Sequence, residues 1–224
     1  GFETVTMAYK GKIEHKDSRG NQGVIGEGDV QWMTAGSGIV HEEYHEKDFS
    51  KQGGTLQMVQ MWVNLPAKNK ETKPAYQDLL FNDMTKVIVD DNGSFVNVIA
   101  GVYKTQKGKG ITFSPINLYN AYLSKGTKAD FTFPSNYNTA ILIIEGAVNV
   151  NGDTELKKNS FAMFENFSDE TFILESIDDN TIVLVMSGEP LNEPIAHYGS
   201  FVMNTQEELD KAFEDYKAGK FGTL

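Results

Sequence analysis

Four residues in the segment GSGIVHEEYH, residues 36–45, have side chains of types that bind transition metals: His41, Glu42, Glu43 and His45. Successive side chains of a β-strand point to opposite faces, so a regular strand would place His41, Glu43 and His45 on one face. Imidazole suits Fe, Cu, Ni and Zn, and a mixed set of imidazole and carboxylate with open positions suits non-haem Fe(II). By itself, however, the H-x-E spacing favours a simpler interpretation, in which these are solvated side chains at a polar strand end.

The other two histidines are not interpreted as ligands, and His15 is interpreted as structural or exposed. His15 lies two residues before Asp17, in a predicted strand that ends at a turn. His197 lies beside Pro194 in the segment EPIAHYGS, which is interpreted as a packed connection. Residues 101–193 contain no histidine. If one half of the chain holds a metal, the first half is therefore the one expected to do so.

The composition excludes several classes of protein. The formal net charge is −11, from 20 Lys and Arg against 31 Asp and Glu, which argues against binding to a nucleic-acid backbone. The chain has no cysteine, so disulfides and thiolate metal sites are excluded. No apolar run approaches the roughly 18 residues that a membrane-spanning helix needs. A cytoplasmic protein with a small-molecule partner or a protein partner fits this composition.

Short β-strands are the elements predicted to position the candidate residues. Runs of β-branched and aromatic residues alternate with turn signals over the first 190 or so positions, at spacings of about 8–12 residues, which is typical of a sandwich or barrel. Asn151-Gly152 predicts a two-residue hairpin turn. The order strand, glycine, strand, turn, strand occurs near the start of the chain and again over residues 140–164. This repeat indicates two related β units.

Two segments depart from the strand pattern. Residues 64–80 contain two prolines and several lysines and are predicted to form a long surface connection. The tail is predicted to be helical, because Thr205 and Glu208 fit a capping box and Gly219 is a suitable stop. The apolar residues of this helix share one face: Leu209, Ala212, Phe213 and Tyr216. The simplest interpretation of this segment is an amphipathic helix that packs on a β unit.

Long stretches of the sequence resemble the pirin family. They are GFETVTMAYKGKIEHKD at the start, GDVQWMTAGSGIVHEE, MWVNLPAKNK with PAYQDL, and SGEPLNEPIAHYGSFVMNT. The resemblance covers essentially the whole chain and implies an all-β bicupin, with two cupin barrels and a C-terminal α-helix. We expect an N-terminal cupin over residues 1–100, lacking its first strands, and a C-terminal cupin with the terminal helix over residues 101–224.

In this family the N-terminal barrel binds one metal, usually iron, through three histidines and a glutamate. The resemblance assigns two of these ligands to His41 and Glu43. The family's other two histidines stand in an H-P-H-R motif immediately before the stretch that begins at Gly1, so we expect them upstream, and a chain without them to hold iron poorly. His45 matches no family ligand and is interpreted as a solvent-facing or pocket-rim residue, with a role as substitute ligand in a truncated protein as the alternative. Glu3 occupies a position where many cupins have a carboxylate ligand, whereas the family uses Glu43.

The resemblance implies an enzyme, a quercetin 2,3-dioxygenase-type oxidoreductase that uses O₂ and a mononuclear metal, with Fe(II) as the expected cofactor. Its partners would be O₂ and a flavonol-like small molecule. Coordination would acidify the flavonol hydroxyl, and Glu43 would be both a metal ligand and the catalytic base that accepts the hydroxyl proton. Trp32 and Met33 are candidate pocket residues, although Trp32 fits a plain core position equally well.

Two alternatives lie in other functional classes. The first is a redox-sensing module that binds a protein partner and regulates transcription without catalysis. The net charge of −11 weakens it, and the small cluster of Lys68, Lys70 and Lys73 is interpreted as a solvated loop. The second is a cupin with an incomplete metal site and a structural role. The sequence leaves the metal open among iron, nickel, copper, manganese and zinc.

Overall fold

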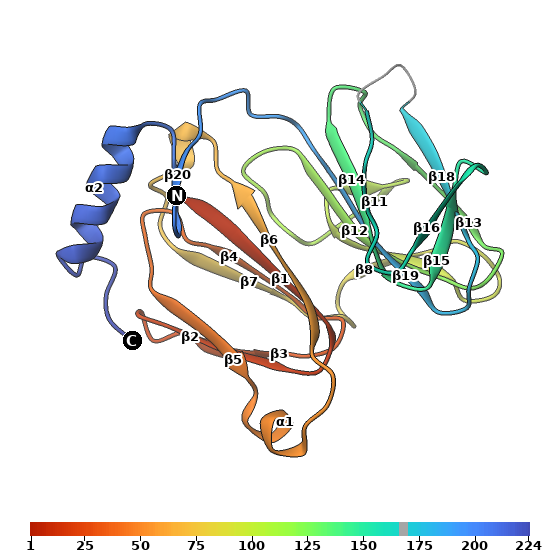
Figure 1. Ribbon diagram of the computed structural model, residues 1–224, viewed down its shortest axis with the longest axis horizontal. Coiled ribbons are helices and arrows are strands. Elements are labelled where there is room, and N and C mark those ends of the chain that lie inside the picture. Colours follow the sequence, from red (N-terminus) through yellow and green to blue (C-terminus); the bar gives the residue numbers. More distant parts are fainter. Residues whose placement is uncertain (166–169) are drawn as a thin grey trace. The chain divides into compact units, whose positions relative to one another are not determined.

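The computed structural model divides into two compact units and describes residues 1–165 and 170–224 (Figure 1). Unit 1 comprises Gly1–Asp83 together with Asn192–Leu224, and unit 2 comprises Met84–Leu191. The expected division into 1–100 and 101–224 therefore differs from the compact units. The difference arises because the chain returns to unit 1 after residue 191 and brings the terminal helix with it.

Unit 1 contains two antiparallel sheets. The first has the order β6-β1-β4-β7, with β1 at Phe2–Lys10, β4 at Val30–Thr34, β6 at Gln57–Asn64 and β7 at Ala75–Leu79. The second has the order β3-β2-β5, with β2 at Ile13–Asp17, β3 at Gln22–Ile25 and β5 at His41–His45. Residues 64–80 are thus more ordered than a surface connection, because β7 adds to the first sheet directly after Pro74, where a proline can precede a strand.

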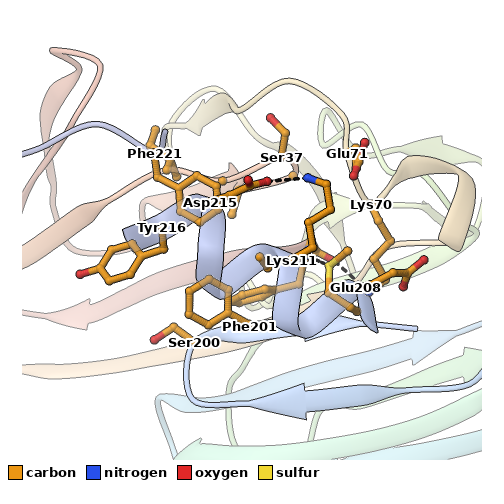
Figure 2. Close-up of a pocket in the computed structure, with 18 of the residues that line it drawn as sticks. Ser37, Lys70, Glu71, Ser200, Phe201, Glu208, Lys211, Asp215, Tyr216 and Phe221 are labelled. Carbon is orange, nitrogen blue, oxygen red and sulfur yellow. Dashed lines mark hydrogen bonds and ion pairs between the residues drawn. The ribbon is translucent and has the colours of Figure 1, made fainter. Parts of the chain in front are cut away.

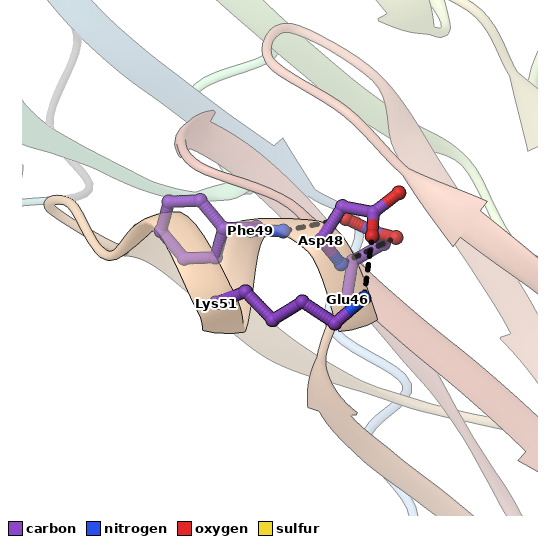
Figure 3. Close-up of polar contacts among 4 residues, drawn as sticks. All are labelled: Glu46, Asp48, Phe49 and Lys51. Carbon is purple, nitrogen blue, oxygen red and sulfur yellow. Dashed lines mark hydrogen bonds and ion pairs between the residues drawn. The ribbon is translucent and has the colours of Figure 1, made fainter.

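Three helical segments and a hairpin complete unit 1. They are α1 at Lys47–Gln52, the 3₁₀ turn η1 at Ala67–Asn69, the hairpin of β20 (Ala196–Tyr198) and β21 (Phe201–Met203), and α2 at Gln206–Lys217. Figure 3 shows how α1 begins: the Glu46 carboxylate accepts the backbone N–H groups of Asp48 and Phe49, at 3.0 and 2.9 Å. This cap ends β5 and turns the chain towards β6.

Unit 2 contains a six-stranded and a four-stranded antiparallel sheet and one short hairpin. The six-stranded sheet has the order β17-β14-β19-β12-β9-β8, with β8 at Thr85–Ile88, β9 at Phe95–Ala100, β12 at Ile116–Leu123, β14 at Asn138–Glu145, β17 at Phe161–Met163 and β19 at Thr181–Gly188. The four-stranded sheet has the order β13-β18-β15-β16, with β13 at Lys128–Thr132, β15 at Ala147–Val150, β16 at Thr154–Lys157 and β18 at Thr171–Ser176. The hairpin joins β10 (Val102–Tyr103) to β11 (Gln106–Lys107).

An apolar core fills unit 2, and stacked aromatic rings form much of it. Phe131 is fully buried, and its ring centroid lies 5.4 Å from that of Phe172 and 6.2 Å from that of Tyr119. The turn between β15 and β16 has the predicted positive φ angles at Asn151 and Gly152, 54° and 83°, but Val150 pairs with Thr154, so the loop has three residues instead of the predicted two. The all-β prediction is therefore confirmed in both units. In the part of the chain that is described, no helix is long and apolar enough to cross a membrane.

Helix α2 begins at the predicted capping box. The Thr205 hydroxyl accepts the Glu208 N–H at 3.2 Å, and the Glu208 carboxylate accepts the Thr205 N–H at 3.1 Å. Leu209 is buried, and the ring of Phe213 lies 4.4 Å from that of Phe201 on β21, so the apolar face of the helix packs on the hairpin. Tyr216, predicted on the same face, is 51% exposed. Figure 1 shows the blue α2 beside the red and orange strands of unit 1.

The capping box of α2 provides a first prediction. Thr205→Ala removes the acceptor for the Glu208 N–H and should lower the free energy of unfolding by about 1 kcal/mol, measured by urea denaturation. Thr205→Ser retains the hydroxyl and should stay within a few tenths of a kcal/mol of the wild type. Equal stability of the alanine variant and the wild type would show that the cap contributes nothing.

Candidate functional site

Glu43 is held by side chains from the facing sheet of unit 1. The Thr6 hydroxyl on β1 donates to Oε1 of Glu43 at 2.9 Å, and the Gln60 amide on β6 donates to Oε2 at 2.6 Å. The same Gln60 nitrogen lies 3.1 Å from the Thr6 hydroxyl, which links the two donors. Both donors are neutral, so the charge of the carboxylate remains available to a cation. Each carboxylate oxygen also retains a second acceptor site.

His41 and Glu43 lie on the same face of β5, as the strand pattern predicts. In the register with β2, His41 is opposite Asp17 and Glu43 is opposite His15. The intervening Glu42 points the other way and forms an ion pair with Lys16, with 2.7 Å between Nζ and Oε1. His41 and Glu43 are both half-buried. The alternation therefore turns both candidate ligands towards the four-stranded sheet.

The other residues of this face differ in their surroundings. His45 is exposed at the end of β5, where its ring lies 6.1 Å from that of Phe49 on α1, at an interplanar angle of 87°. Asp17 is buried, and its carboxylate accepts the backbone N–H groups of Arg19 and Asn21, at 2.8 and 2.9 Å. Asp17 thus serves the turn that follows β2.

His15 is buried, in agreement with a structural role. Its Nε2 lies 2.5 Å from the amide nitrogen of Gln31, which can only donate, so this imidazole nitrogen accepts and the proton is assigned to Nδ1. Nδ1 has no hydrogen-bond partner within the described residues. Burial lowers the pKa of His15, against the opposing influence of Asp78, Glu43 and Asp17. A neutral imidazole next to Glu43 follows from this environment.

His41 and Glu43 fit a transition metal in the kind of donor atom and in the face they share. They do not fit in number, because no group of three or more His, Asp or Glu side chains that could hold a metal ion occurs among residues 1–165 and 170–224. These two side chains are therefore candidates for part of a coordination shell, and any complete site needs further donors.

Glu3 and Trp32 face away from these candidates. Since Thr6 on β1 points to Glu43, Glu3 lies on the opposite face of the same strand. It is 1% exposed, and the Thr34 hydroxyl donates to its Oε1 at 2.6 Å. Burial raises the pKa of Glu3. Trp32 is fully buried beside Glu3 on that face, which makes it a core residue, whereas Met33 shares the face of Gln31.

Lys70 does not belong to a solvated cluster, so that interpretation is wrong for this residue. Its side chain is 3% exposed, and its ammonium group donates to the carbonyl oxygen of Gly1 at 2.9 Å, to Oδ1 of Asn64 at 2.5 Å and to the carbonyl oxygen of Val202 at 3.2 Å. Burial lowers the pKa of Lys70 to about 8. Lys68 and Lys73 are exposed. His197 is also exposed, on β20.

A cavity of about 400 Å³ opens beside His41. Figure 2 shows its polar and aromatic walls, which come from the loop 35–40, from β21 and from helix α2. Aromatic side chains on these walls include Phe201, Tyr216 and Phe221, and charged ones include Lys211 and Asp215. The sequence did not predict that these side chains of α2 and its neighbours lie near His41, because α2 follows His41 by more than 160 positions and no motif links the two segments.

Comparisons with known proteins identify both halves of the chain. The family model of the pirin C-terminal cupin domain matches residues 118–222, and the pirin model matches residues 1–63. Pirin-1 of Arabidopsis thaliana is 36% identical over 225 residues, which cover 99% of this chain and 76% of that protein.

Solved structures agree with these matches. The crystal structure of a quercetin 2,3-dioxygenase from Acinetobacter baumannii is 45% identical and superposes with a TM-score of 0.93, over 100% of this chain and 77% of that one. The bacterial pirin YhhW from Escherichia coli, solved in complex with nickel(II), is 20% identical, with a TM-score of 0.65 over 84% of this chain and 73% of that one. At that identity the second likeness supports the fold alone.

The buried Glu3 provides a second prediction. Because its pKa is raised in the folded state, the folded protein binds more protons than the unfolded chain in the window between the two pKa values, and stability falls as the pH rises through that window. Glu3→Gln retains the acceptor for Thr34 and removes the charge. It should raise the free energy of unfolding at pH 7 and abolish this part of the pH dependence, measured by urea denaturation between pH 4 and 8.

Glu214→Gln is the matched control, since it removes the same charge from an exposed position on α2. It should leave the pH dependence of stability close to that of the wild type. If Glu3→Gln were less stable than the wild type at pH 7, the buried carboxylate would be a stabilising group and this account of Glu3 would be wrong.

Proposed function

This chain belongs to the pirin family, and from that premise we propose that it is a metal-dependent oxidoreductase of the quercetin 2,3-dioxygenase type. Such an enzyme opens the central ring of a flavonol with O₂. The observation that carries the proposal is the placement of His41 and Glu43 on one face of β5, with His41 also lining a cavity of about 400 Å³. That volume lies in the range of small-molecule sites, about 300–1,000 Å³.

His41 and Glu43 would hold the metal as two of its ligands. A bound metal acidifies a hydroxyl group that coordinates to it and polarises the substrate. Fe(II) is the expected ion, because imidazole and carboxylate donors with open positions suit it. Thr6 and Gln60 would keep the Glu43 carboxylate in one orientation, since each donates to a different oxygen.

Glu43 would also accept the proton of the flavonol hydroxyl. The hydrogen bonds from Thr6 and Gln60 use one acceptor site on each oxygen and leave another, so the carboxylate can receive a proton without first losing a partner. Gln60 is exposed, which keeps this side of Glu43 reachable from solvent.

The alternative function, a redox-sensing module that binds a transcription factor, receives less support. It would use a basic surface patch. Of the three lysines that could contribute to one in residues 68–73, Lys70 is buried among three oxygen acceptors.

The test of the proposed function uses the full-length protein reconstituted with Fe(II) under anaerobic conditions. On addition of O₂ and quercetin, the flavonol absorption band should decay with matching O₂ consumption, and chelation of the metal should stop both. Glu43→Gln keeps the size of the side chain and removes the base and the anionic ligand, and should lower the rate by at least about a hundredfold. A fully metallated protein that leaves quercetin intact would contradict the proposed function.

The assignment of ligands is tested separately by the metal content of purified full-length protein. His41→Ala should strongly reduce the metal bound per chain, because it removes an inward-facing donor. His45→Ala is the matched control on the same strand and should leave the metal content unchanged, since His45 is exposed and packs on Phe49. Equal losses from both variants would show that the ligands are assigned wrongly.

A further inference from the structure

One wall of the cavity that His41 lines is an aromatic cluster anchored by the C-terminal segment. The ring of Phe201 on β21 lies 6.1 Å from that of Tyr216 and 6.3 Å from that of Phe221. Phe221 packs directly on the backbone of Gly38, where a Cβ atom would lie 2.3 Å from Cε1 of the ring. The Ser18 hydroxyl donates to the Phe221 carbonyl oxygen at 2.5 Å. The aromatic wall is thus joined to the loop that leads into His41.

A carboxylate on α2 is held ionised at this wall. Asp215 accepts hydrogen bonds from the ammonium groups of Lys211 and Lys220, each at 2.5 Å. The hydrogen bonds from Lys211 and Lys220 lower the pKa of Asp215. Its side chain is 18% exposed, while those of both lysines are 62% exposed. Figure 2 shows the Lys211–Asp215 pair next to Phe201, Tyr216 and Phe221.

The combination of aromatic faces with a few charged groups limits the class of ligand. Aromatic rings favour stacking with a flat ring system. An ionised carboxylate accepts hydrogen bonds from hydroxyl groups and repels an anion, so a phenol suits Asp215 better than a carboxylic acid does. Ala212, which has a small side chain, also lines the cavity.

We propose that the cavity beside His41 binds a planar phenolic molecule and that helix α2 forms its specificity-determining wall, with Ala212 and Asp215 as the selecting residues. This inference rests on the proposed function, because it names the part of the protein that would hold the flavonol. A flavonol would lie against the aromatic wall, with one end near His41 and a ring hydroxyl donating to Asp215. Neither Ala212 nor Asp215 would take part in the reaction itself.

The experiment measures quercetin binding to the full-length protein after removal of metal by chelation, using equilibrium dialysis. Ala212→Phe fills the cavity and should weaken binding at least about tenfold. Ala218→Phe is the matched control, the same substitution at the exposed residue directly after the helix, outside the cavity, and should bind as the wild type does. Thermal denaturation of both variants verifies that they are folded.

Asp215→Asn tests whether Asp215 accepts a hydrogen bond from a hydroxyl group of the ligand. It should weaken the binding of quercetin several-fold and leave the binding of unsubstituted flavone, which has no hydroxyl to donate, within about twofold of the wild type. Equal effects on the two compounds would exclude a hydrogen bond from the ligand to Asp215. Failure of the wild-type protein to bind quercetin, or equal binding by Ala212→Phe and Ala218→Phe, would overturn the assignment of the cavity.

These outcomes separate the two proposals. If Ala212→Phe weakens quercetin binding but the metallated protein does not oxidise quercetin, the assignment of the cavity stands and the proposed enzymatic function is wrong. If the protein oxidises quercetin and Ala212→Phe leaves KM unchanged, the proposed function stands and the assignment of the cavity as the flavonol site is wrong. If both proposals hold, Ala212→Phe should raise KM at least about tenfold with little change in kcat, because it removes binding and not chemistry.

Discussion

The antiparallel pairing of β2 with β5 is the constraint on which the chemistry of unit 1 depends. It places Glu43 opposite His15 and His41 opposite Asp17, so that all four side chains share the face turned to the other sheet. A slip of one residue would exchange this face for the one that carries Glu42, and both candidate ligands would point outward. The turn after β2 resists such a slip, because the Asp17 carboxylate accepts two of its backbone N–H groups.

The two units use similar pairs of antiparallel sheets for different purposes. Between the sheets of unit 2, rings such as those of Phe131 and Phe172 stack and fill the space, which stabilises the unit with a mostly apolar core. In unit 1 the facing strands carry Thr6, Gln31 and Gln60, whose amides and hydroxyl hold Glu43 and His15 in place. The interior of unit 1 thus contains an oriented set of polar side chains in place of part of an apolar core.

The return of residues 192–224 to unit 1 connects the end of the chain to the candidate site. Helix α2 is fixed at its start by a capping box and along its length by contacts of Phe213 with the hairpin of β20 and β21. After the helix, Phe221 packs on Gly38, three residues before His41. A pocket lined by His41 is therefore built from segments far apart in the sequence.

Local patterns in the sequence determined the strand-rich architecture, the Asn151-Gly152 turn, the capped terminal helix and the shared face of His41 and Glu43, because each depends on residues close together in the chain. The resemblance of long stretches of the sequence to the pirin family indicated the family. Only the tertiary structure decided which groups surround those two side chains. The hydrogen bonds of Glu43 to Thr6 and Gln60 and the aromatic wall on α2 depend on how distant strands pair and where the chain returns. No periodicity or spacing encodes such contacts, since they come from packing between segments far apart in sequence.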